Sequence, residues 1–169
     1  GSIYDNTTGG TTTLRGATDV VVVGNYAYVT SNTEDGVSIV DVSDPTTPVQ
    51  VGNVIDGGTR ELDGAWGIAV VGNYMYVTGN IDDGVSIYDI SDPTTPVHTG
   101  SITDDATTKL DGARGITVVG RYAYVTSDTD LGLEILDISN PAAPVHVGAV
   151  AGAINATHDV TVVGNYAYV

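Results

Sequence analysis

Short runs of Val, Ile, Tyr and Thr alternate with turn-forming residues along the whole chain, and no stretch has the apolar spacing of a helix. Residues 68–71 are continuously apolar, which predicts a strand buried on both faces. Gly72 and Asn73 then predict a tight hairpin turn, because Gly accepts the positive φ that such turns require. Residues 74–77 form the second predicted strand of this hairpin.

Two further strands complete the unit. Residues 84–89 predict a third strand, which is bounded by Gly84 before it and Pro93 after it. Residues 91–96 predict a bend, because Pro fixes φ and an Asp side chain can accept hydrogen bonds from backbone amides. Residues 97–103 predict a fourth strand. The four strands follow one another as an antiparallel meander.

The same pattern occurs three times in full and begins a fourth time. Residues 16–63 and 64–111 are units of 48 residues, residues 112–155 are a unit of 44, and residues 156–169 begin another. A four-stranded unit repeated at this period is typical of a β-propeller blade. A solenoid usually has shorter repeats, and a sandwich rarely repeats its strands so closely. We therefore predict an all-β propeller of four-stranded antiparallel blades, forming one domain over residues 1–169.

The two ends of the chain predict one blade that is split between them. Residues 2–5 match residues 86–89, so residues 1–15 supply strands three and four, and residues 156–169 supply strands one and two. Because an unpaired strand edge is an aggregation hazard, we expect it to be covered. The split blade can close within one chain, between two chains, or along a filament in which each chain donates its N-terminal hairpin. The predicted closure residues are Ile3, Tyr4, Tyr166 and Tyr168.

A longer motif carries a family resemblance. The segment Gly-Val-Ser-Ile-Val-Asp-Val-Ser-Asp-Pro at residues 36–45 recurs from Gly84 and, modified, from Gly132. It resembles the LVIVD-repeat propellers, which occur mostly in extracellular proteins of bacteria and archaea. The resemblance covers nearly the whole chain and implies the propeller fold and an extracellular or cell-surface location. It supplies no catalytic residues, because the family shares none.

The charge of the chain excludes several classes of partner. Asp and Glu number 21 against five Lys and Arg, which gives a formal net charge of −16. Such a chain cannot neutralise a run of phosphates or bind an anionic membrane surface, so we expect neither nucleic acid nor membrane insertion. It suits a cationic partner, or a medium rich in salt or calcium. The absence of Cys excludes disulfides and thiolate zinc sites.

The positions just before the first strand of each unit differ from unit to unit. They are Thr18, Trp66, Arg114 and His158, followed by Asp19, Gly67, Gly115 and Asp159. Strand one lines the central channel of a propeller, so these residues are expected to surround its mouth. We predict a candidate site there for a small ligand or a peptide, formed by Trp66, Arg114, His158, Asp159 and Asp19. Drift at an exposed loop is the competing interpretation.

The loops between strands two and three are acidic and end in Gly. Their carboxylates are hard oxygen ligands of the kind that calcium prefers, so calcium is the candidate cofactor. The candidate ligands are Asp35, Asp82, Asp83, Asp128 and Asp130. The loops lack the full twelve-residue calcium motif, which favours their interpretation as ordinary polar turns. Asp63 and Asp111 are expected on the same acidic edge.

Other recurring residues have structural interpretations. The paired tyrosines of strand two are expected to pack between blades, because the chain has no Phe to supply bulk. Asp41, Asp89 and Asp137 recur at the end of strand three and are expected to bond the amides of the proline bend. His98 and His146 lie on the outer strand, where a zinc site is not favoured. No Ser-His-Asp arrangement is recognisable.

These observations together predict a non-catalytic extracellular module for surface binding, adhesion or protein interaction. Its expected partners are proteins, including further copies of itself. One alternative is a structural subunit of an extracellular filament. The second alternative is an enzyme or small-ligand binder at the channel mouth.

Overall fold

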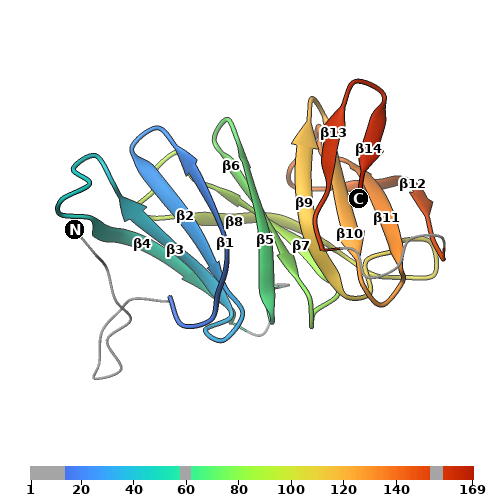
Figure 1. The fold of residues 1–169 in the computed structure, drawn as a ribbon, viewed down its shortest axis with the longest axis horizontal. Coiled ribbons are helices and arrows are strands. Elements are labelled where there is room, and N and C mark those ends of the chain that lie inside the picture. Colours follow the sequence, from blue (N-terminus) through green and yellow to red (C-terminus); the bar gives the residue numbers. More distant parts are fainter. Residues whose placement is uncertain (1–13, 58–61, 153–157) are drawn as a thin grey trace.

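The computed structural model describes residues 14–57, 62–152 and 158–169. Within these ranges the chain forms three four-stranded antiparallel sheets and one two-stranded sheet. The strands of each sheet pair in chain order, as the meander predicted. Figure 1 shows the sheets side by side in a fan, with the sheet of residues 17–55 at one end and the hairpin of residues 161–168 at the other. The part of the chain that the structure describes has no helix long and apolar enough to span a membrane.

The three complete blades have nearly identical strand boundaries. Blade one consists of β1 (Ala17–Val23), β2 (Tyr26–Ser31), β3 (Gly36–Asp41) and β4 (Val49–Ile55). Blade two consists of β5 (Ala65–Val71), β6 (Tyr74–Gly79), β7 (Gly84–Asp89) and β8 (Val97–Thr103). Blade three consists of β9 (Ala113–Val119), β10 (Tyr122–Ser127), β11 (Gly132–Asp137) and β12 (Val145–Val150). The terminal hairpin consists of β13 (Thr161–Val163) and β14 (Tyr166–Tyr168).

The predicted strands of blade two are confirmed, but the first begins three residues earlier than its apolar run. The pairing of β5 with β6 is irregular between Ala65 and Ile68. There the Gly67 N–H donates to the Thr78 hydroxyl at 2.8 Å, which replaces a regular ladder bond. The strand therefore continues through a residue that, in the sequence, resembles a break.

The predicted turns are also confirmed. Gly72 has a φ of +60°, the left-handed conformation that its hairpin turn requires. At the proline bends, Asp41, Asp89 and Asp137 each accept a hydrogen bond from the N–H two residues later, at 2.8–2.9 Å. The recurring carboxylates at the end of strand three are therefore structural.

Neighbouring blades pack through two apolar clusters. Tyr28 and Ile39 of blade one meet Ile68 and Met75 of blade two in the first cluster. The second cluster repeats this contact between blades two and three, where it contains Tyr76. Tyr28 and Tyr76 are both buried, which confirms the packing role expected for the strand-two tyrosines.

Candidate functional site

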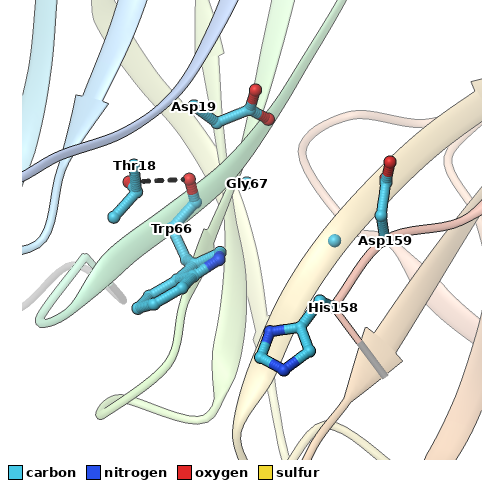
Figure 2. Close-up of a pocket in the computed structure, with 7 residues that line it drawn as sticks. Thr18, Asp19, Trp66, Gly67, His158 and Asp159 are labelled. Atoms are coloured by element: carbon cyan, nitrogen blue, oxygen red, sulfur yellow. Dashed lines mark hydrogen bonds between the residues drawn. The ribbon is translucent and has the colours of Figure 1, made fainter. Parts of the chain in front are cut away.

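A hollow of about 210 Å³ lies where the first strands of the blades converge. It is lined by residues from β1, β5 and β9 and from the segment that leads into β13. These residues are Thr18, Asp19, Trp66, Gly67, Gly115, His158 and Asp159. Figure 2 shows Asp19 and Asp159 on opposite sides of the hollow, with Trp66 and His158 beside them. The structure thus brings together four of the five residues proposed for the channel mouth.

Glycines at positions 67 and 115 allow neighbouring blades to lie close together at the mouth. A Cβ at Gly67 would lie 2.3 Å from the Arg114 carbonyl oxygen, and one at Gly115 would lie 2.6 Å from the Asp159 Cα. Both distances are shorter than any real contact, so only Gly allows the first strands to approach this closely.

Two buried threonines, which the sequence interpretation missed, hold the mouth in shape. The Thr30 hydroxyl donates to the Trp66 carbonyl oxygen at 2.6 Å. The Thr78 hydroxyl makes the equivalent bond to the Arg114 carbonyl oxygen. Each bond crosses from one blade to the first strand of the next. The available signal was a Thr next to the last residue of the second strand in each of the three complete units.

The two carboxylates are positioned by backbone amides. One oxygen of Asp19 accepts a bond from the Val20 N–H at 2.7 Å, and the other accepts one from Ile68 N–H of the next blade at 3.1 Å. Asp159 repeats the first of these bonds, with the Val160 N–H at 2.7 Å. Backbone N–H donors therefore hold both carboxylates in fixed orientations at the mouth.

Arg114 lies beside the hollow rather than in its lining. Its guanidinium stacks on the Trp66 ring, with Cζ 4.5 Å from the ring centroid. Nη2 pairs with an Asp128 carboxylate oxygen at 2.5 Å, and Nη1 donates to His158 Nδ1 at 2.7 Å. A guanidinium can only donate, so His158 accepts through this nitrogen. The charge of Arg114 is therefore already matched, and Asp128, a candidate calcium ligand, is the residue that matches it.

The other four candidate calcium ligands bind the backbone of neighbouring loops. Asp35 and Asp83 accept bonds from Gly64 N–H and Gly112 N–H at 3.0 and 2.8 Å. Asp82 and Asp130 accept bonds from the amides of Asp63 and Asp111, at 2.8 and 3.2 Å. These contacts confirm that the loops share one acidic edge. In the described ranges no three His, Asp or Glu side chains converge where they could hold a metal ion, and calcium stays a prediction.

Two carboxyl groups on this acidic edge have pKa values above the usual value for Asp. Burial, followed by the negative charges of Asp35 and Asp82, raises the pKa of the Asp63 carboxyl. Burial and then Asp83 raise the pKa of Asp111 in the same way. The edge therefore concentrates negative charge that favours a cation nearby.

The predicted closure residues fall into two groups. Ile3 and Tyr4 lie outside the described residues. Tyr166 and Tyr168 lie on β14 and are exposed, unlike the equivalent tyrosines of blades one and two.

A buried carboxylate in blade three was also missed. Glu134 on β11 is fully buried where blades one and two have Ser38 and Ser86. It contacts His146 Nδ1 at 2.5 Å and accepts a bond from the Lys109 N–H at 2.9 Å. Burial raises the pKa of Glu134, and these two partners oppose that shift. His98, the other outer-strand histidine, packs edge-on against Tyr88.

Solved structures similar to this chain are larger propellers. They include a periplasmic gluconolactonase from Pseudomonas aeruginosa, with 12% identity and a TM-score of 0.68. This match covers 85% of this chain and 41% of the gluconolactonase. A hydrazine synthase from Kuenenia stuttgartiensis has 19% identity and a TM-score of 0.67, and the match covers 93% of this chain and 42% of the synthase. A protein from Lactobacillus plantarum has 16% identity and a TM-score of 0.68, and the match covers 86% of this chain and 45% of that protein. At these identities the likeness shows the fold alone, and the chain spans less than half the length of each.

Among curated proteins none matches this chain. The LVIVD repeat model matches residues 15–56, 64–104, 112–151 and 155–169. These four matches follow the three complete blades and the terminal hairpin, and together they include most of the sequence. The chain belongs to the LVIVD-repeat family, and its fold is a β-propeller of four-stranded antiparallel blades.

Proposed function

We propose that this chain is a non-catalytic extracellular binding module whose channel-mouth hollow takes a cationic group of a protein partner. The group is a primary ammonium or a guanidinium, as on a Lys or Arg side chain. The observation that carries this proposal is the placement of Asp19 and Asp159 on two sides of a hollow that Trp66 also lines. The carboxylates accept the charged head, and the indole provides an apolar wall for the methylene stem.

The charges around the hollow support a cation rather than an anion. Its lining contains two carboxylates and no Lys or Arg. The nearest guanidinium, that of Arg114, is already paired with Asp128. A phosphate or carboxylate ligand would meet repulsion from both aspartates and from a chain of net charge −16. The Arg114 guanidinium on Trp66 also shows that this ring accepts a cation.

The state of the other lining groups supports binding without catalysis. The Thr18 hydroxyl donates to the Trp66 carbonyl oxygen at 2.9 Å, so its proton is engaged with the backbone. His158 receives an N–H from Arg114 at Nδ1. Neither group is arranged as a nucleophile with an adjacent base. The gluconolactonase shares only the fold with this chain, and fold does not imply activity.

Location outside the cell is part of the proposal. It rests on membership of a family found mostly in extracellular proteins and on the strong acidity of the chain, which suits a salty medium.

Calorimetry with a hexalysine peptide tests this function. Replacing both carboxylates, Asp19→Asn with Asp159→Asn, is expected to weaken binding at least tenfold, because two charged contacts become neutral. The double change Asp44→Asn with Asp92→Asn, at two proline bends away from the hollow, removes the same number of charges and is the matched control. Hexaglutamate is expected not to bind.

Equal losses of affinity in the hollow variant and in the Asp44→Asn, Asp92→Asn control would mean that the peptide responds only to net charge, and would overturn the proposal. Hydrolysis of a panel of sugar lactones by the wild-type chain, abolished by Asp159→Asn, would overturn the non-catalytic assignment and favour the enzyme alternative.

A further inference from the structure

One residue that lines the hollow, His158, is of a type that changes its charge near neutral pH. The repeat-equivalent residues are Thr18, Trp66 and Arg114, of which none is of that type. His158 is exposed to solvent, so its ring can exchange a proton directly with water. A change in its charge takes place inside the site that we propose for a cationic group.

The contact between Arg114 and His158 requires a neutral imidazole. Arg114 Nη1 lies 2.7 Å from His158 Nδ1 and 3.5 Å from its Nε2. A guanidinium offers only N–H donors, so a ring nitrogen must accept this hydrogen bond, and an imidazolium has no nitrogen that can accept. Protonation of His158 therefore removes the bond and places two positive charges side by side.

Arg114 is held in place by its other contacts, whereas His158 is not. Nη2 of Arg114 pairs with an Asp128 carboxylate oxygen at 2.5 Å, and its Cζ lies 4.5 Å from the centroid of the Trp66 ring. The Arg114 side chain is only 18% exposed, and His158 belongs to the exposed class. The imidazolium is therefore the partner that moves away when the two charges repel.

The charged groups around His158 determine where its ring then goes. They are Arg114 on β9, Asp128 on the loop that leads into β11, Asp159 next to it in the chain, and Asp19 on β1 across the hollow. Arg114 repels the imidazolium, and Asp128 is already paired with Arg114. Figure 2 shows His158 and Asp159 on one side of the hollow, with Trp66 and Asp19 across from them. The unpaired attraction for the imidazolium thus comes from the two aspartates that line the hollow.

We infer that His158 makes the cation site pH-dependent: its neutral ring binds Arg114 and leaves the carboxylates to the ligand, and its protonated ring leaves Arg114 and displaces the ligand. This inference rests on the proposed function, because the displaced ligand is the cationic group assigned to the hollow. The imidazolium repels an ammonium or guanidinium and competes with it for Asp19 and Asp159. The site is therefore expected to bind near neutral pH and to release below about pH 6.

Fluorescence of Trp66, the sole Trp of the chain, tests the switch without any ligand. Acidification from about pH 7.5 to about pH 5.5 is expected to change its emission, because the charge and contacts beside its ring change. His158→Gln keeps a neutral acceptor for Arg114 at both pH values and should remove this change. His98→Gln, on β8 in the outer part of blade two, is the matched control and should retain it.

Calorimetry with hexalysine tests the release at the same two pH values. In the wild type and in His98→Gln, affinity should fall roughly fivefold to tenfold on acidification, because one positive charge is added to the hollow. In His158→Gln, the affinity should change by less than about twofold. His158→Lys carries a charge at both pH values and should bind weakly at both.

No emission change in the wild type, or one that persists in His158→Gln, would overturn the inference. An equal fall in hexalysine affinity in the wild type and in His158→Gln would overturn it as well, since the loss would then come from other groups. If hexalysine does not bind at neutral pH, the proposed function fails instead. The emission of the unliganded chain then still decides whether protonation of His158 alters the mouth.

Discussion

Blade two and the terminal hairpin have nearly the same sequence pattern but opposite environments. Blade two has a neighbour on both faces, and its strand β6 is almost entirely buried. Strand β14 carries the equivalent Tyr-Ala-Tyr segment and is exposed along its whole length. The apolar pattern of a blade therefore indicates which of its surfaces can be buried. The neighbouring blades determine which of those surfaces are buried.

The joints between blades differ in a second way. In blades one and two, Asp35 and Asp83 have positive φ and bind the first loop amide of the next blade. In blade three this position is Leu131, with a φ of 52°. A leucine is strained in this conformation and offers no acceptor. The loop of blade three is therefore less favourable at this position than the equivalent loops of blades one and two.

The largest expected change in stability comes from truncating a buried tyrosine, compared with truncating an exposed one. Tyr76→Ala removes a side chain packed between blades two and three and should destabilise the fold by roughly 3–5 kcal/mol. Tyr168→Ala should change the stability of a monomer by about 0.5 kcal/mol or less. Urea unfolding at a fixed low protein concentration measures both. Similar losses for the two variants would mean that the hairpin is buried in solution.

A smaller effect is expected from repairing the joint of blade three. Leu131→Asp places a residue that tolerates positive φ at this position, and should stabilise the fold by roughly 0.5–1 kcal/mol. The reverse change, Asp83→Leu, removes the bond to Gly112 N–H and should destabilise it by a similar or larger amount. Thermal unfolding of both variants checks the comparison, and a destabilised Leu131→Asp chain would contradict it.

The smallest effect concerns the acidic edge. The folded pKa of Asp63 is raised, so the stability associated with it is present below the unfolded value of 3.8 and declines as pH rises through the folded pKa. Asp63→Asn should therefore raise the melting temperature at pH 7 by roughly 1–3 °C and have no effect at pH 3. Salt should raise the wild-type melting temperature more than that of the variant.

The control for this effect is Asp105, whose pKa is lowered to about 2 by hydrogen bonds from Thr107 and Thr108. Its stabilisation is present at neutral pH and is lost as pH falls below about 4 towards 2. Asp105→Asn should therefore lower the melting temperature at pH 7, opposite in sign to Asp63→Asn. Equal responses of the two variants would show that local contacts do not govern either carboxylate.

Short-range spacing was enough to predict much of the fold. The hairpin at Gly72, the bend after Asp89 and the four-stranded unit depend on residues a few positions apart, and each is confirmed. The position of Trp66 and His158 at a common mouth followed from the repeat, because residues at equivalent positions of the blades surround the same channel.

Only the tertiary structure decided how the mouth residues are used. The pairing of Arg114 with Asp128 removes a cation that the sequence had placed among the ligand groups. The bond from Thr30 to the Trp66 carbonyl and the burial of Glu134 against His146 were likewise invisible in the chain. By itself the sequence determined the strands, the turns and the repeated blade, since hydrophobic period and turn chemistry act locally. The tertiary structure decided which charges are matched and which apolar surfaces stay open, because those depend on contacts between neighbouring strands and blades.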